Sequence, residues 1–315
     1  MSHKIVFMGT PDFAVTSLEK IVESGIEVVA VVTAPDRKSG RGQKLTPSPV
    51  KNAALEFNIP VLQPEKLKDE GFIQELASFN ADLFVVVAFR MLPREVWSLP
   101  KKGTINLHGS LLPQYRGAAP INWAIINGET ETGATTFFID EKIDTGAIID
   151  AIKIPISETM NAGDLHDKMM VEGAELLVKT IHHIFNNTIK TTSQKEVDPS
   201  NLKDAPKIFK EDCKIIWSEP TSKIYNKIRG LSPYPAAFTI IEDGDTSKIL
   251  KIFNCSPVSG SYAIGEIVLS DEHIIIGTLD GGIELKVVQL EGKKRMAIED
   301  FRRGFDISNF KISQK

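Results

Sequence analysis

Two polar side chains, Asn106 and His108, stand two residues apart in a run that otherwise predicts a short buried strand. Thr104, Ile105 and Leu107 favour that strand. Side chains two apart on a strand point to the same side, so the amide and the imidazole would project together from its end. An amide donates hydrogen bonds without carrying charge, and an imidazole titrates near neutral pH. Such a pair suits a reaction in which a carbonyl oxygen gains charge while a proton moves.

The same pair is also compatible with a simple strand cap, because a three-residue motif often occurs by chance. The residues around it favour chemistry. Gly109 and Pro113 end the predicted strand in a loop, and the stretch from Gly103 to Gly117 reads GTINLHGSLLPQYRG. A motif of this length is far more specific than the pair alone.

The elements that must position this pair predict a parallel α/β sheet. A buried strand at Lys4–Met8 turns through Gly9 into a helix, and Val28–Val32 forms a second strand, which is the strand–helix–strand unit of parallel sheets. The Gly9–Asp12 turn lacks the full glycine fingerprint of a dinucleotide fold, so NAD is not expected. Ala81–Ala88 is a continuous apolar run, as in a central parallel strand covered on both faces. Phe89–Pro93 follow its carboxyl end, where open α/β sheets bind ligands.

Further helices and strands continue to alternate along the chain. The sequence predicts helices at Val50–Phe57, Gly71–Phe79, Ala118–Asn127 and Asp164–Phe185, and strands at Ile59–Leu62, Ala134–Ile139 and Ala147–Ile156. The acidic stretch Asp140–Gly146 lies in a loop between two of these strands. His166, His182 and His183 on the long helix are expected at its surface or end.

Residues Ala34–Pro49 have no periodicity and many glycines and prolines, which predicts an exposed, mobile loop. Arg37, Lys38, Arg41 and Lys44 make this loop basic. Most charge runs are only solvated surface, although a long loop beside an active site is more often functional.

Composition and charge place the chain among soluble globular proteins. It has 315 residues, of which 42% are hydrophobic and 25% charged, and this length suits two domains. No apolar run is long enough to span a bilayer, and the strand at Lys4 leaves no room for the apolar core of a signal peptide. Cys213 and Cys255 form neither a disulfide framework nor a plausible zinc site. We therefore expect a protein of the reducing cytoplasm that binds no metal and no membrane.

The last third of the chain has a different pattern. Residues 189–205 are polar and poor in large apolar side chains, as in a linker. A helix at Thr221–Gly230 follows, and then evenly spaced short strands predict a small β-barrel or sandwich: Ala237–Glu242, Lys248–Cys255, Gly265–Leu269, Ile274–Thr278 and Ile283–Gln289. From Lys203 onward, 17 basic residues stand against 16 acidic ones, whereas the net charge of the whole chain is −4. This balance permits a polyanionic partner without requiring one.

The long motif resembles the signature of the folate-dependent formyltransferases, and the resemblance to the methionyl-tRNA formyltransferase family covers nearly the whole chain. The segments that carry it are Gly9–Ala14, Gly40–Lys51, Asn106–Gly117, Ala118–Ile121, Asp144–Gly146, Ile216–Trp217, Arg229–Pro235 and Gly292–Met296. One segment departs from the family pattern, since Ala88–Pro93 is one residue shorter than in many members.

This resemblance implies a doubly wound, mostly parallel α/β formyl-transfer domain at residues 1–188, a linker at 189–205, and a C-terminal OB-like β-barrel that binds tRNA at 206–315. It implies direct transfer of a formyl group from 10-formyltetrahydrofolate to the amine of methionine on initiator tRNA. The family's catalytic Asn, His and Asp fall on Asn106, His108 and Asp144.

The binding residues implied by the resemblance form two sets. Folate binding falls on Phe89, Arg90, Met91, Leu92, Ser110, Leu111, Leu112, Pro113 and Asp140. Contacts to tRNA fall on Arg37, Lys38, Arg41, Lys44, Lys293, Lys294 and Arg295. The implied protein is a monomer.

Two other functions stay open on the sequence. One is a formyltransferase acting on an amino sugar nucleotide or another small amine, which shares the catalytic trio. The other is a nucleic-acid-binding protein whose α/β domain is catalytically silent. The basic residues favour tRNA over the small amine. The intact trio speaks against a silent domain.

Overall fold

The computed structural model describes residues 3–39, 44–194, 199–270 and 273–313. The chain forms two compact units, neither of which is continuous in sequence. The first, here called the sheet unit, comprises Met1–Gly117, Thr132–Pro155 and His166–Asp204. The second, the barrel unit, comprises Ala118–Glu131, Ile156–Leu165 and Ala205–Lys315. Two segments that precede residue 166 therefore belong with the C-terminal part of the chain, and the single linker at 189–205 stays a prediction.

The sheet unit contains a seven-stranded sheet in the order β10-β9-β7-β6-β1-β2-β5. Its strands are β1 (Lys4–Gly9), β2 (Glu27–Val32), β5 (Val61–Leu62), β6 (Leu83–Val87), β7 (Thr104–His108), β9 (Glu131–Phe138) and β10 (Ile148–Pro155). The pairs from β5 through β2, β1 and β6 to β7 are parallel, and β7 pairs with β9 antiparallel. The expected doubly wound, mostly parallel sheet is confirmed.

Chain direction explains where the sheet can bind a ligand. From β1 the chain moves outward to β2 and β5, and then returns to β6 on the other side of β1. The helices that follow β1 and β6 therefore leave the sheet in opposite directions, and open α/β sheets bind ligands beyond the carboxyl ends of such strands. His108 ends β7, which is the next strand along.

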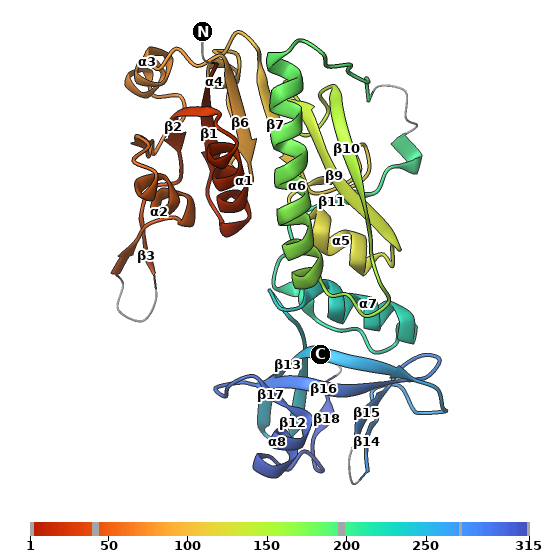
Figure 1. Ribbon diagram of the computed structural model, residues 1–315. Helices are drawn as coiled ribbons and strands as arrows, with labels where there is room; N and C mark the ends of the chain where they lie inside the picture. Colours follow the sequence, from red (N-terminus) through yellow and green to blue (C-terminus); the bar gives the residue numbers. More distant parts are fainter. Residues whose placement is uncertain (1–2, 40–43, 195–198, 271–272, 314–315) are drawn as a thin grey trace. The chain divides into compact units, whose positions relative to one another are not determined.

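Helices cover both faces of this sheet (Figure 1). They are α1 (Asp12–Glu23), α2 (Pro49–Glu56), α3 (Glu70–Ser78), α4 (Arg94–Trp97) and α6 (Ala162–Phe185). Alternate strand residues such as Val6, Phe84 and Val86 pack with α3 and α4 in one core. On the opposite face, α6 approaches β7 closely at Gly173, where an added Cβ would lie 3.2 Å from Leu107. Since residues alternate along a strand, Asn106 and His108 project away from α6.

The basic segment between β2 and α2 is not a loop throughout, so that expectation was wrong in part. β3 (Arg37–Ser39) and β4 (Lys44–Thr46) pair antiparallel as a short hairpin. Backbone hydrogen bonds hold such a pair without apolar periodicity, which is why the side-chain pattern did not reveal it. Leu45 is 67% exposed, so the hairpin has no core of its own.

Asp36 holds the base of this hairpin. Its carboxylate accepts hydrogen bonds from Gln63 Nε2 and Lys51 Nζ, each at 2.7 Å. These two hydrogen bonds, that from Gln63 first, hold the pKa of Asp36 below its ordinary value. Lys51 lies in the first turn of α2, whose N-cap Ser48 accepts from the Lys51 backbone N–H. The hairpin is therefore tied to the start of α2.

The barrel unit is built on an antiparallel sheet in the order β14-β15-β16-β13-β12-β18, with β17 beside β16. Its strands are β12 (Ala237–Asp243), β13 (Thr246–Val258), β14 (Ile267–Leu269), β15 (Ile274–Gly277), β16 (Gly282–Leu290), β17 (Met296–Ala297) and β18 (Lys311–Ile312). Its helices are α5 (Pro120–Ile126), α7 (Thr221–Leu231) and α8 (Ile298–Gly304), with a 3-10 turn, η2 (Glu211–Cys213). The nearly closed sheet confirms the expected barrel. The remaining elements are β8 (Arg116–Gly117), η1 (Pro199–Asn201) and β11 (Asp204–Ala205).

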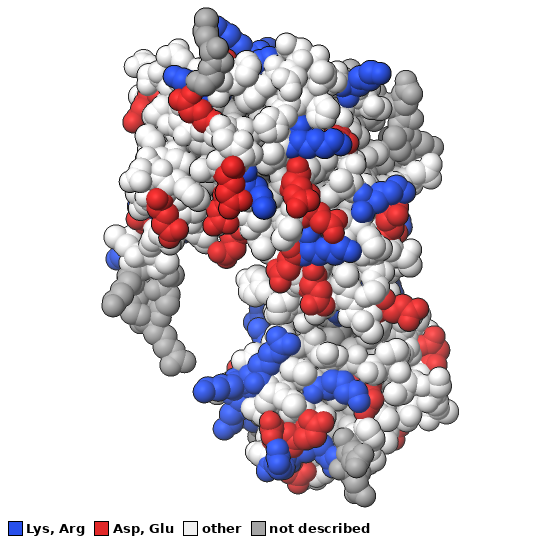
Figure 2. Space-filling view, in the orientation of Figure 1, with Lys and Arg blue, Asp and Glu red and all other residues white. Residues whose placement is uncertain are grey.

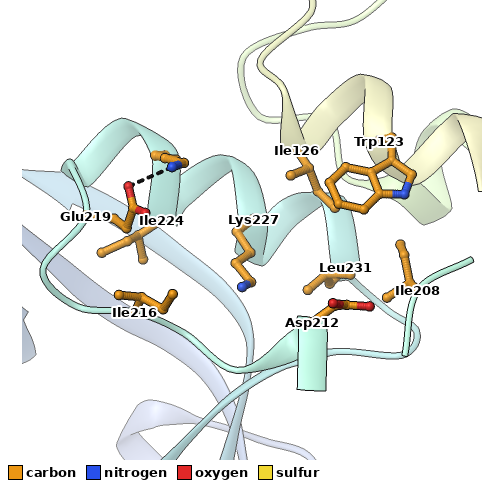
Figure 3. A pocket seen from close by; sticks show the side chains of 10 residues that line it. Trp123, Ile126, Ile208, Asp212, Ile216, Glu219, Ile224, Lys227 and Leu231 are labelled. Carbon is orange, nitrogen blue, oxygen red and sulfur yellow. Dashed lines mark ion pairs between the residues drawn. The ribbon is translucent and has the colours of Figure 1, made fainter. Parts of the chain in front are cut away.

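A hollow of about 250 Å³ lies in the barrel unit beside α7 (Figure 3). Its walls are largely apolar, with Trp123, Ile216 and Leu231 among them. Lys227 points its amine into this hollow and donates a hydrogen bond of 2.7 Å to the backbone oxygen of Lys214. Burial lowers the pKa of Lys227. The lysine head is thus held by one carbonyl in surroundings that disfavour its charge.

Candidate active site

Asn106 and His108 stand on β7 between β6 and β9. Asn106 pairs in register with Val86 on β6 and Phe137 on β9, and His108 lies opposite Thr135. Within the described part of the chain the Asn106 side chain makes no hydrogen bond, and it is only partly buried. Its amide therefore remains able to donate to a substrate. His108 is 6% exposed.

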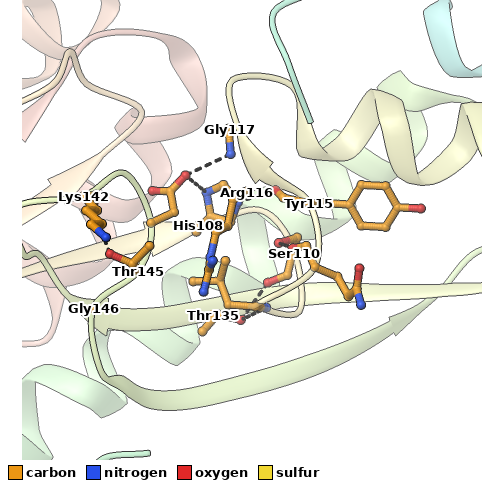
Figure 4. A network of polar contacts seen from close by, with 12 residues as sticks. His108, Ser110, Tyr115, Arg116, Gly117, Thr135, Lys142, Thr145 and Gly146 are labelled. Carbon is orange, nitrogen blue, oxygen red and sulfur yellow. Dashed lines mark hydrogen bonds and ion pairs between the residues drawn. The ribbon is translucent and has the colours of Figure 1, made fainter. Parts of the chain in front are cut away.

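An acceptor faces each ring nitrogen of His108 (Figure 4). Nε2 lies 2.8 Å from the backbone oxygen of Tyr115, and Nδ1 lies 3.7 Å from Oδ2 of Asp144. A carbonyl oxygen only accepts, so Nε2 carries a hydrogen. An imidazolium can direct its second N–H toward the carboxylate.

Asp144 and Asp140 lie in one loop, and their carboxylates make different contacts. Oδ1 of Asp140 accepts from the Lys142 backbone N–H and from the Thr145 hydroxyl, so Asp140 caps the turn. Asp144 has a φ of +55°, and its carboxylate accepts from the Gly117 N–H at 3.0 Å beside His108. The carboxylate of Asp144 thus lies beside the histidine, while that of Asp140 forms the turn.

Gly146 lets this loop pass close to β9. A Cβ at Gly146 would lie 1.6 Å from the backbone oxygen of Phe138, which no side chain tolerates. The spacing Asp144-Thr-Gly146 is therefore a backbone requirement that places the carboxylate.

The turn that follows β7 is held by buried hydroxyl groups. Ser110 Oγ donates to the backbone oxygen of Gln114 at 2.6 Å. Thr135 Oγ1 donates to the backbone oxygen of Ser110 and accepts from the Leu112 N–H. Ser110 and Leu112 are buried, whereas Leu111 and Pro113 are half-buried. Two of the predicted folate residues therefore also shape the backbone that carries the Tyr115 acceptor.

Four of the other predicted folate residues, Phe89 to Leu92, follow the carboxyl end of β6, and Asp140 follows β9. Arg90, Met91 and Leu92 line a hollow of about 510 Å³, whose further lining residues are Leu67, Lys68, Pro93, Arg94, Glu95, Trp97 and Glu141. Met91 is 71% exposed, Asp140 is exposed, and Phe89 is half-buried under the Arg90 guanidinium. Apolar walls with nearby cations fit a ligand that has a flat ring and a carboxylate tail, as a folate does.

Two backbone carbonyl groups hold the Arg90 side chain in place. Its guanidinium donates to the carbonyl oxygens of Pro64 and Glu65. Burial lowers the pKa of Arg90, and the positive charge of Arg37 adds to that effect. Arg37 on the hairpin is thus close enough to Arg90, which follows β6, for the two positive charges to repel each other.

The predicted tRNA residues lie in both units. Arg37 and Lys38 are exposed on β3, Lys44 begins β4, and Arg41 lies outside the described residues. Lys293, Lys294 and Arg295 are exposed in the turn between β16 and β17. Figure 2 shows basic side chains gathered over this turn, and acidic ones over α1 and α6 of the sheet unit. The Arg295 guanidinium lies 4.3 Å from the centre of the Phe253 ring.

Sequence reasoning missed Gln194 and Arg116. Gln194 is 6% exposed although its segment had been predicted as a linker. Its side chain bonds to the Asp144 loop and to Arg116. The local pattern contained no signal for Gln194, since one glutamine in a polar run is typical of a surface.

Comparisons with known proteins agree with this geometry. Residues 3–181 match the family model described as formyl transferase, and residues 207–306 match formyl transferase, C-terminal domain. The chain is 49% identical over 311 residues to the methionyl-tRNA formyltransferase of Bacteroides thetaiotaomicron, covering 97% of each chain. The chain belongs to the methionyl-tRNA formyltransferase family. The Azobacteroides pseudotrichonymphae member is 54% identical, over 96% of this chain and 95% of its own.

Solved structures share the fold of this family. WlaRD, a sugar 3N-formyl transferase, superposes with a TM-score of 0.64 at 22% identity, covering 93% of this chain and all of its own. The N-formyltransferase of Helicobacter canadensis superposes with a TM-score of 0.62 at 25% identity, covering 90% of this chain and 98% of its own.

Two further observations concern the described residues only. None of their helices is both long and apolar enough to cross a membrane. No three metal-ligating side chains gather among them.

Proposed function

We propose that this chain transfers a formyl group from 10-formyltetrahydrofolate to the α-amine of methionine on initiator methionyl-tRNA, for translation initiation. One observation carries the proposal: Asp144 lies 3.7 Å from His108, which follows Asn106 by two residues on β7, in a chain 49–54% identical to methionyl-tRNA formyltransferases.

Asn106 and His108 stabilise the oxyanion that forms when the amine attacks the formyl carbonyl. In the formyl donor, 10-formyltetrahydrofolate, this carbonyl is bonded to a nitrogen that acts as the leaving group. The free amide of Asn106 donates a hydrogen bond to this oxygen, and a protonated His108 donates a second one when the formyl oxygen takes the place of the Tyr115 carbonyl at Nε2. Each such donor typically lowers a barrier by about 3 kcal/mol. Their common strand makes the two groups a preorganised pair.

Asp144 orients His108 and balances its charge. Its carboxylate lies 3.7 Å from Nδ1 of His108, and the Gly117 N–H holds it in place. The attacking amine must lose a proton and the leaving nitrogen must gain one, and we assign the transfer of that proton to this pair. Cys213 and Cys255 are buried in the barrel unit. Direct transfer needs no nucleophilic side chain.

The folate binds at the carboxyl ends of β6 and β7. Its proposed contacts are Phe89, Arg90, Met91, Leu92, Ser110, Leu111, Leu112, Pro113 and Asp140, of which Arg90, Met91 and Leu92 line the hollow. These residues offer apolar surface and a cation. No resident metal is part of the proposal.

The tRNA binds through basic residues of both units. The proposed contacts are Arg37, Lys38, Arg41 and Lys44 in the hairpin segment, and Lys293, Lys294 and Arg295 in the barrel unit. The exposed positions of Arg37, Lys38 and the three barrel residues support this proposal. The protein acts as a cytoplasmic monomer.

An amino sugar nucleotide is the alternative acceptor. It is supported by structural likeness to N-formyltransferases at 22% and 25% identity, against 49% and 54% for the tRNA relatives. The test offers labelled 10-formyltetrahydrofolate with either methionyl-tRNA or a dTDP-amino sugar. We expect label on methionyl-tRNA only. Label on the sugar alone would overturn the proposal.

A further inference from the structure

Gln194 lies beside the start of β10 although it is distant in sequence from the catalytic strand. An isolated bridge joins Thr192 to Ile148 by two backbone hydrogen bonds, of 2.8 and 2.9 Å. This bridge brings the segment before Gln194 against the Asp144 loop. The side chain that follows is almost fully buried.

Both the nitrogen and the oxygen of the Gln194 side-chain amide form hydrogen bonds. Nε2 donates to the backbone oxygen of Gly146 at 2.7 Å and to that of Asp144 at 3.2 Å. Oε1 accepts from the Arg116 guanidinium, at 2.7 Å from Nη2 and 3.2 Å from Nε. One side chain therefore ties the Asp144–Gly146 loop to the segment that contains Arg116.

These two tied segments are the ones that bracket His108. The Asp144 loop supplies the carboxylate at Nδ1, and the segment around Arg116 supplies the Tyr115 carbonyl at Nε2 and the Gly117 N–H that holds Asp144. Asp144 and Tyr115 both have positive φ, at +55° and +59°. Such conformations persist in non-glycine residues only where their surroundings hold them.

We propose that Gln194 is a positioning residue for formyl transfer, which sets the Asp144–His108 geometry by clamping these two segments together. The inference rests on the function proposed above. Gln194 does not touch the reacting atoms. Removing its amide leaves the Gly146 carbonyl and the Arg116 donors without this partner, and the carboxylate loses its fixed place beside the imidazole.

The chain provides a matched control in Gln114. This glutamine also makes two ties between neighbouring segments, donating to the Asn201 backbone oxygen and accepting from the Lys203 N–H, each at 2.9 Å. Its side chain contacts neither the Asp144 loop nor His108 in these bonds. Gln114→Ala therefore measures the effect of loosening the same region without touching the clamp.

The experiment compares Gln194→Met, which keeps the length of the side chain, with Gln114→Ala. For Gln194→Met we expect faster backbone hydrogen exchange across residues 140–148 and about 10- to 100-fold slower single-turnover formyl transfer, since small displacements cost this much. KM for both substrates and the melting temperature should change little. Gln194→Glu, which keeps the Arg116 contact and loses both donated bonds, should also be slow and serves if the Met variant fails to fold.

A double mutant decides whether Gln194 acts through Asp144. In an Asp144→Ala background, Gln194→Met should cause no further loss, because the group that it positions is gone. Additive losses would overturn the inference, as would near-wild-type transfer in Gln194→Met or an equal loss in Gln114→Ala. If wild-type protein fails to formylate methionyl-tRNA, the proposed function falls, and the exchange measurement alone still decides whether Gln194 holds the loop.

Discussion

Among single residues, the two carboxylates of the Asp140–Gly146 loop illustrate how backbone conformation assigns roles. Oδ1 of Asp140 accepts hydrogen bonds from the Lys142 N–H and the Thr145 hydroxyl. Asp144 has a positive φ, and its carboxylate lies beside His108. Identical side chains four residues apart therefore differ in chemistry because their surroundings differ.

Alanine at Asn106, His108 or Asp144 should lower the single-turnover rate by about 10²- to 10³-fold each, the usual effect of losing one oxyanion donor or its partner. Rapid-quench measurement of formyl transfer to methionyl-tRNA, with thermal melts, tests this expectation. His183→Ala is the control, because His183 is an exposed side chain on α6. Near-wild-type chemistry in one variant would remove that residue from the mechanism.

Among the elements, the barrel strands and the turn before α7 bury both thiols. Cys255 on β13 is 5% exposed and Cys213 in η2 is 2% exposed. Burial raises the pKa of both thiols, that of Cys255 to about 12. The thiolate is the reactive form, so neither cysteine reacts readily while the barrel unit is folded.

Thiol labelling should therefore report opening of the barrel unit. At pH 8 the native protein should react slowly with an aromatic disulfide reagent, because the pKa values lie above this pH and access is blocked. Denaturant should release two thiols per chain at once as their pKa falls toward about 8.5. Absorbance of the released thiolate follows both phases. Rapid labelling of either cysteine without denaturant would contradict the buried placement.

For the molecule as a whole, basic surface occurs on both compact units. The hairpin carries Arg37 and Lys38, and the turn between β16 and β17 carries Lys293, Lys294 and Arg295. A tRNA is long enough to reach residues of more than one domain, and each neutralised phosphate releases counterions. Binding through such surfaces depends on salt in proportion to the number of phosphates contacted.

The rate with subsaturating methionyl-tRNA should fall steeply with salt, by a logarithmic slope of about 0.7 to 0.9 for each phosphate contact. Arg41→Leu should weaken use of methionyl-tRNA and reduce this slope, while hydrolysis of the folate donor alone is spared. Lys20→Leu is the control, since Lys20 is a cation on α1 outside the basic hairpin. A flat salt profile with an inert Arg41→Leu would favour a small-amine acceptor.

Most helices and strands were predictable because their signals are local. The continuous apolar runs within Leu83–Val87 and Lys4–Gly9 follow directly from burial of a parallel strand on both faces. The β3–β4 hairpin was not predictable, since backbone pairing on a charged surface leaves no side-chain pattern. The grouping of Ala118–Glu131 with the barrel unit was equally hidden, because contacts between distant segments decide it.

The sequence by itself determined that Asn106 and His108 share one side of a strand, since alternation along β7 is a property of the backbone. Its long motif also determined the family. Only the tertiary structure placed the Asp144 carboxylate 3.7 Å from His108, and only it assigned Asp140 to the turn and Gln194 to the clamp. Those assignments depend on left-handed backbone at Asp144 and on a bridge between Ile148 and Thr192, which lie 44 residues apart in sequence. Such contacts arise from packing of the whole unit, and no local pattern encodes them.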